Sequence, residues 1–170
     1  MMMKFSRKLL GAVTLFAMFS SFEANAQTTV TRNLNVNATV PTVCLVDSAA
    51  TIDLNFDLSD LVTRATDYVV DVTLDWRCSA TVPVVVELGG ADATARAMSG
   101  PNPLPYKLTD DSDVAWGNGA NGATSRTLTG AGMGAAAQQN TVIRGTLLLA
   151  DAQAAEVGAY SETVVISFTY

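Results

Sequence analysis

Strict alternation of apolar and polar residues is the feature that most limits the fold of this chain. Between Tyr68 and Cys78 every second side chain is apolar, and most of the others are polar, such as Asp71 and Asp75. A period of two is typical of a β-strand with one face in a core and the other in water. The pattern therefore predicts a half-buried antiparallel strand with Cys78 on its core face.

The same alternation recurs along the chain and predicts an all-β protein. Further strands are expected over residues 51–57, 82–88, 104–108, 142–149 and 160–170. Pro83 has no N–H to donate, so it marks a strand start or a sheet edge. Residues 117–140 are rich in glycine and predict a mobile loop with one strand around 126–129. No stretch after residue 26 predicts a helix of three turns, and the strand spacing is that of a β-sandwich.

Residues 1–26 are typical of a secretory signal peptide. Basic residues come first, an apolar run from Leu9 to Phe19 follows, and Ala24-Asn25-Ala26 matches a cleavage site. The apolar run is shorter than the roughly 20 residues that a membrane-spanning helix needs. The sequence therefore predicts export through the periplasm, with no stable membrane insertion.

Composition argues against several classes of function. The 170 residues include 10 Lys and Arg, 16 Asp and Glu and no His, for a net charge of −6. Nucleic-acid binding needs clustered basic residues, and most metal and acid–base sites use His. We therefore expect no nucleic-acid partner, no metal, no cofactor and no enzymatic activity. Asp110, Asp111 and Asp113 lack the spacing of a calcium loop and predict a solvated turn.

Cys44 and Cys78 form an even pair behind an export signal. In an oxidising compartment such a pair is most simply a disulfide, which would stabilise the chain by roughly 4 kcal/mol on the chain-entropy model. The alternative is a redox-active pair, but such pairs usually lie close together as C-x-x-C. The sequence favours the structural disulfide.

The two ends of the exported chain both alternate. Residues 28–40 place five apolar side chains on one face, namely Val30, Leu34, Val36, Ala38 and Val40. Arg32 is the single charged residue on that face. The C-terminal residues Tyr160, Val164, Ile166, Phe168 and Tyr170 also share a face. A C-terminal strand at a sheet edge would need a partner from another chain.

Residues 28–170 resemble the spore coat protein U domain family of archaic chaperone–usher pilus subunits. The resemblance rests on the alternating start that runs into Cys44, on Cys78 and on a series of short motifs in a shared order. These motifs are Arg96-Ala97-Met98, Leu104-Pro105-Tyr106-Lys107-Leu108, Trp116-Gly117-Asn118-Gly119, Val142–Gly145 and the closing run from Gly158 to Ile166.

This resemblance implies an incomplete immunoglobulin-like β-sandwich that lacks its last strand. It implies a donor-strand extension at 27–43 and a pilin domain at 44–170. A periplasmic chaperone would lend the missing strand along Val164, Ile166, Phe168 and Tyr170, and the extension of another pilus subunit would replace it at an outer-membrane usher. Arg32 would then lie outside the groove, if the donor begins near Leu34, or reach an acidic residue of the partner.

The resulting hypothesis is a structural subunit of a cell-surface pilus, for attachment and biofilm formation. The alternative is a secreted or surface-coat β-sandwich that acts as a monomeric binding protein, and a periplasmic enzyme is a weaker third. Whether residues 28–40 pair within their own chain or across chains separates the first two.

Overall fold

The computed structural model describes residues 29–46, 51–90, 96–120 and 122–170. The predicted signal peptide lies outside these residues. The chain divides into two units, Met1–Ala38 and Thr39–Tyr170. In the first unit, the described residues 29–38 form neither helix nor strand. Their apolar side chains are open to solvent, with Val30 71%, Leu34 86% and Val36 81% exposed.

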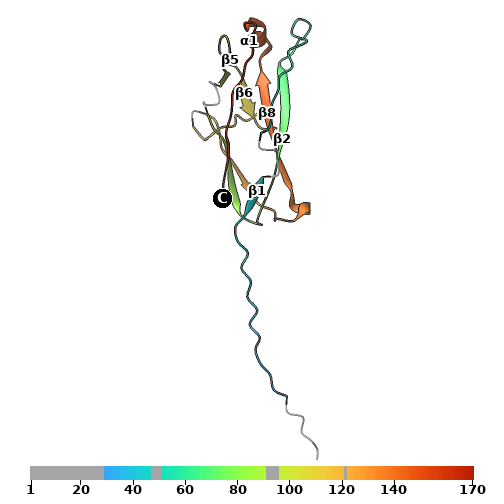
Figure 1. Ribbon diagram of the computed structural model, residues 1–170, viewed down its shortest axis with the longest axis vertical. Coiled ribbons are helices and arrows are strands. Elements are labelled where there is room, and N and C mark those ends of the chain that lie inside the picture. The colour runs from blue at the N-terminus through green and yellow to red at the C-terminus, as the bar shows by residue number, and fades with distance from the viewer. Residues whose placement is uncertain (1–28, 47–50, 91–95, 121) are drawn as a thin grey trace, which may run out of the picture. The chain divides into compact units, whose positions relative to one another are not determined.

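The second unit is built from antiparallel sheets (Figure 1). The four-stranded sheet has the order β1 (Cys44–Val46), β2 (Tyr68–Cys78), β8 (Gln139–Leu147) and β6 (Lys107–Thr109). The three-stranded sheet has the order β7 (Arg126–Thr129), β3 (Pro83–Leu88) and β9 (Ile166–Thr169). The remaining elements are the strand pair β4 (Ala97–Met98) and β5 (Leu104–Pro105), the turn η1 (Ala135–Ala137) and the helix α1 (Leu149–Ala154).

The core lies between the two main sheets. Leu74 and Trp76 of β2 face Val84 and Val86 of β3, and all four side chains are buried. Trp116 is also fully buried, and its indole N–H donates a hydrogen bond of 3.1 Å to the carbonyl of Val86. A buried indole with its N–H satisfied adds apolar area without an unpaired donor. This tryptophan therefore stabilises the sandwich rather than presenting a surface contact.

Several predicted strands are confirmed, because their alternating side chains lie in turn in the core and on the surface. β2 and β7 have the predicted bounds, and β3 begins at Pro83. β8 begins earlier than predicted and ends before Leu149. Leu149 is instead the first residue of α1, and its N–H donates to the carboxylate of Asp67 at 2.8 Å. β9 covers only the last part of the predicted 160–170 strand.

Two predictions are wrong. Residues 51–57 form no strand, since no neighbouring strand pairs with them among the described residues. Asp110 is buried rather than solvated. Its carboxylate accepts the N–H groups of Ser112 and Val114 at 2.8 Å each and forms an ion pair with Arg126. A buried charge is tolerated when it is paired and hydrogen-bonded in this way.

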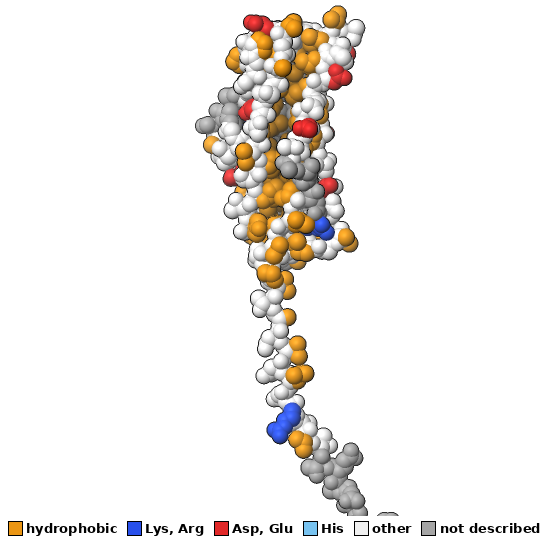
Figure 2. Space-filling view, viewed as in Figure 1, with side chains coloured by type: hydrophobic (Ala, Val, Ile, Leu, Met, Phe, Trp, Pro, Cys, Tyr) orange, Lys and Arg blue, Asp and Glu red, His pale blue; other side chains and the backbone are white. Residues whose placement is uncertain are grey.

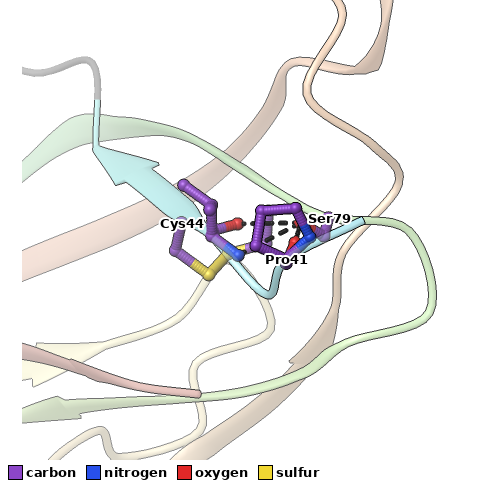
Figure 3. Close-up of a disulfide and its surroundings, with 5 residues drawn as sticks. Pro41, Cys44 and Ser79 are labelled. Atoms are coloured by element: carbon purple, nitrogen blue, oxygen red, sulfur yellow. Dashed lines mark hydrogen bonds between the residues drawn. A yellow bond between two sulfur atoms is a disulfide. The ribbon is translucent and has the colours of Figure 1, made fainter. Parts of the chain in front are cut away.

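The predicted disulfide between Cys44 and Cys78 is present and joins the paired strands β1 and β2 (Figure 3). Ser79, directly after Cys78, fixes the residues that precede β1. Its hydroxyl donates to the carbonyl of Pro41 at 3.0 Å and accepts the N–H of Val43 at 3.1 Å. The start of β1 is thus tied to the sheet both covalently and by hydrogen bonds.

Replacing both cysteines by alanine is expected to lower the free energy of unfolding by about 4 kcal/mol, the chain-entropy value for a loop of this size. The bridge spans 34 residues, so its loss frees much of the unfolded chain. Urea unfolding of the wild type and the Cys44→Ala/Cys78→Ala variant measures the difference. Alkylation of the non-reduced protein should find no thiol, and two reactive thiols would contradict the assignment.

Candidate functional site

An open groove runs along the second unit, between residues 51–57 on one side and residues 161–168 on the other. It consists of two adjoining pockets of about 280 and 610 Å³. Their linings share Ile52, Asp53, Glu162, Val164 and Ile166. Figure 2 shows hydrophobic side chains exposed in a band along one face of this unit. The apolar lining is therefore open to solvent rather than covered by the chain's own strands.

The first wall of the groove is the segment 51–57, which has the burial pattern of a strand without a strand's partners. Ile52, Leu54 and Phe56 are half-buried and pack against the core, while the residues between them are exposed. Gly145 of β8 makes room for them, because a Cβ there would come within 2.6 Å of Leu54. The segment thus lies on the core of the sandwich with an open backbone edge beside it.

The second wall is β9 together with the residues that precede it. β9 pairs with β3 in a register that sets Thr169 against Val85, and Gly89 donates to the carbonyl of Val165 at 2.8 Å. Backbone groups point alternately to the two sides of a strand. The N–H and C=O groups of Val164, Ile166 and Phe168 therefore face the other side, where none of the described strands pairs with β9.

Polar groups interrupt the apolar lining at two places. Tyr106 lies on the floor of the groove. Its burial and, as a smaller effect, the nearby carboxylate of Glu162 raise the pKa of its hydroxyl. The phenol therefore stays protonated and donates toward Glu162. Arg96 is buried beside them and donates to the carbonyls of Leu88 and Gly89 at 3.0 Å each. On the opposite wall the one charged residue of the groove lining is Asp53.

The arrangement suits the binding of an extended peptide. A strand between the two walls could hydrogen-bond to both open edges and place alternate side chains on the apolar floor. The floor is formed by Val72, Leu74, Leu88, Leu108 and Ile143. Among the described residues, no group of three or more His, Cys, Asp or Glu side chains could hold a metal ion.

The groove unites some residues that the sequence singled out. Val164, Ile166 and Phe168 line it, whereas Tyr170 is 58% exposed and outside the lining. The five apolar residues of the 28–40 stripe are all exposed. Sequence reasoning missed residues 51–57 as a wall. The alternation of these residues was visible in the sequence. No sequence signal indicated that none of the described strands would pair with them.

Fold and groove together define an incomplete immunoglobulin-like β-sandwich, whose groove has the place and the open edges of one further strand. The chain belongs to the family of the Spore Coat Protein U domain, whose model matches residues 30–167. The family resemblance found in the sequence is therefore confirmed.

Solved structures with a similar fold include the "CsuC-CsuE chaperone-tip adhesion subunit pre-assembly complex from archaic chaperone-usher Csu pili of Acinetobacter baumannii". The identity is 22% and the TM-score is 0.51. The match covers 78% of this chain and 41% of that one. Among curated proteins, none gives a significant sequence match. No helix in the described part of the chain is long and apolar enough to cross a membrane.

Proposed function

We propose that this protein is a structural, non-catalytic subunit of an archaic chaperone–usher pilus that serves surface attachment and biofilm formation. The open groove between 51–57 and 161–168 carries the proposal. A sandwich that leaves two backbone edges and an apolar floor open can be completed by a strand from another chain. Subunits that fill one another's grooves polymerise head to tail.

The donor strand in this proposal is residues 28–40 of the next subunit. Its stripe of Val30, Leu34, Val36, Ala38 and Val40 matches an apolar floor that also repeats every second residue. Residues 29–40 lie outside the chain's own sheets. Because these residues do not pair with any described strand of their own chain, the pilus subunit is favoured over the monomeric binding protein.

The fold also favours one direction for the donor. Cys44 pairs with Cys78 at the end of β2, and Thr169 pairs with Val85 near the start of β3. These two pairs therefore lie close to the turn that joins β2 to β3. The start of the domain and the end of β9 therefore lie at the same pole (Figure 1). Head-to-tail growth requires the donor to leave the groove at the other pole. The donor then runs antiparallel to β9, with its first residues beside Phe168.

Before polymerisation, the groove needs a temporary occupant. In our proposal, a periplasmic chaperone lends a strand along β9 and an outer-membrane usher exchanges it for the extension of the next subunit. An unfilled groove would expose apolar side chains and an open strand edge, both of which promote aggregation. The similar structure from Acinetobacter baumannii is a pre-assembly complex of a pilus subunit with a chaperone, which supports this order of events.

Val36→Asp is expected to abolish polymerisation while leaving chaperone binding intact. Val36 lies in the middle of the stripe, and an unpaired carboxylate in an apolar groove costs several kcal/mol. The groove of the same subunit is unchanged, so it still accepts the chaperone strand. Unheated gels of periplasmic protein co-expressed with chaperone and usher should lose the ladder of multimers, and the chaperone should still co-purify.

Asn35→Asp is the matched control, because it adds the same charge on the polar face of the same segment. It should leave the ladder intact. Normal fibres from the Val36→Asp subunit would show that residues 28–40 are not the donor. A monodisperse monomer from the wild type, without any chaperone, would favour the binding-protein alternative.

A further inference from the structure

The donor segment and the groove each carry very little charge, and the charges are opposite. Residues 28–40 contain one charged side chain, Arg32. In the linings of the two pockets the charged residues are Asp53 and Glu162, both acidic and on opposite walls. This complementarity concerns the groove of the proposed function, and the inference below rests on that function.

The two carboxylates are not equivalent. Glu162 lies close to a cation of its own subunit, since a Cβ at Gly90 would be 3.3 Å from Nη1 of Arg96 and 3.6 Å from Oε1 of Glu162. The hydroxyl of Tyr106 on the floor of the groove also lies near it. Both side chains are exposed, but Asp53 makes no hydrogen bond or ion pair with the other described residues. A second chain that enters the groove therefore finds its unengaged carboxylate at Asp53.

Both carboxylates line both pockets, but they lie on opposite walls of the groove. One pocket contains Thr51 together with Phe168, and the other contains Phe56 together with Tyr160. The wall 51–57 thus runs from the Phe168 end to the Tyr160 end, and Asp53 lies in its first half. A donor antiparallel to β9 brings its first residues, including Arg32, into that same half.

An arginine on the apolar face of the donor strand can be accommodated without burying its charge against the apolar floor. Arg32 lies on the apolar face of the donor, so its methylene stem can contact the floor while its guanidinium turns outward to the rim. Asp53 lies on the exposed face of its segment, at that rim. A guanidinium that reached the floor without a partner would be strongly unfavourable.

We propose that Arg32 of one subunit pairs with Asp53 of the subunit that it completes, and that this ion pair selects the register of the donor strand. An alternating apolar stripe can slip by two residues and still bury its apolar face. A slipped strand would separate Arg32 from Asp53, so the pair favours one register over its neighbours.

The experiment measures the uptake of a dye-labelled synthetic peptide of residues 28–40 by the full mature subunit in complex with its chaperone. The peptide carrying Arg32→Glu should enter the wild-type groove about tenfold more slowly, because it replaces an attraction at the rim by the repulsion of two carboxylates. The Asp53→Lys subunit should accept this peptide faster than the wild-type subunit does. Glu162→Lys is the control on the other wall and should give no such rescue.

A milder variant, which removes only the charge of Asp53, tests the same ion pair with less change to the subunit. With Asp53→Asn, uptake of the wild-type peptide should fall by about two- to fivefold, the size of an exposed ion pair, and should lose its dependence on salt. Equal uptake of the wild-type and Arg32→Glu peptides, or rescue by Glu162→Lys instead of Asp53→Lys, would overturn the pairing but leave the proposed function standing. No uptake of the wild-type peptide would overturn both.

Discussion

A chain that carries a copy of residues 28–40 after Tyr170, in place of the original copy, is expected to be a stable monomer that needs no chaperone. The appended strand can enter the groove of its own sandwich at high effective concentration, so no second chain is required. A donor antiparallel to β9 begins beside the end of β9. A short flexible linker after Tyr170 should therefore be sufficient, as in a β-hairpin.

The expected stabilisation is large. Burying the side chains of Leu34, Val36, Ala38 and Val40 contributes on the order of 5 kcal/mol at roughly 25 cal/mol per Å² of apolar surface. This contribution is comparable to the whole net stability of a marginal domain. The melting temperature should rise by about 10 °C or more.

Light scattering after gel filtration and thermal unfolding by circular dichroism measure these two effects. The same fusion with Val36→Asp in the appended strand is the matched control, and it should regain neither the monomeric state nor the higher melting temperature. The incomplete-fold interpretation fails if the unmodified chain is already a monodisperse monomer and the appended strand leaves its melting temperature unchanged.

Deletion of residues 167–170 is expected to remove nearly all recoverable protein from the periplasm. The deletion takes away most of β9, which pairs with β3 and forms one wall of the groove. It also removes Phe168, whose ring packs against Trp76 with centroids 6.3 Å apart. Phe168 is half-buried, so its loss costs part of the roughly 3–5 kcal/mol that a fully buried phenylalanine contributes. The chaperone would have little edge left to pair with.

Deletion of Tyr170 alone is the matched control, because Tyr170 lies beyond β9 and is more than half exposed. This shorter deletion should retain most of the yield. Yields are compared by immunoblot of periplasmic extracts, with and without the co-expressed chaperone. A stable, chaperone-bound chain that lacks residues 167–170 would contradict the assignment of β9 as the pairing edge.

The sequence alone was sufficient to predict those features that depend on which way a side chain faces. Alternation located β2 and β3 almost residue by residue, and the even cysteine count behind an export signal predicted the bond between Cys44 and Cys78. The stripes at the two ends were visible because a period of two repeats along the chain itself. These signals are local, so no knowledge of distant neighbours was needed.

Tertiary structure decided which strands have partners. Residues 51–57 alternate as well as a paired strand does, yet none of the described strands pairs with them, because pairing depends on neighbours that are distant in sequence. Asp110 shows the same limit. Its carboxylate is buried only because Arg126 and two backbone N–H groups surround it in the fold. The groove follows from the same distinction. Side-chain alternation is encoded locally in the sequence, whereas the gap between residues 51–57 and β9 depends on how the described strands pair in the sheets.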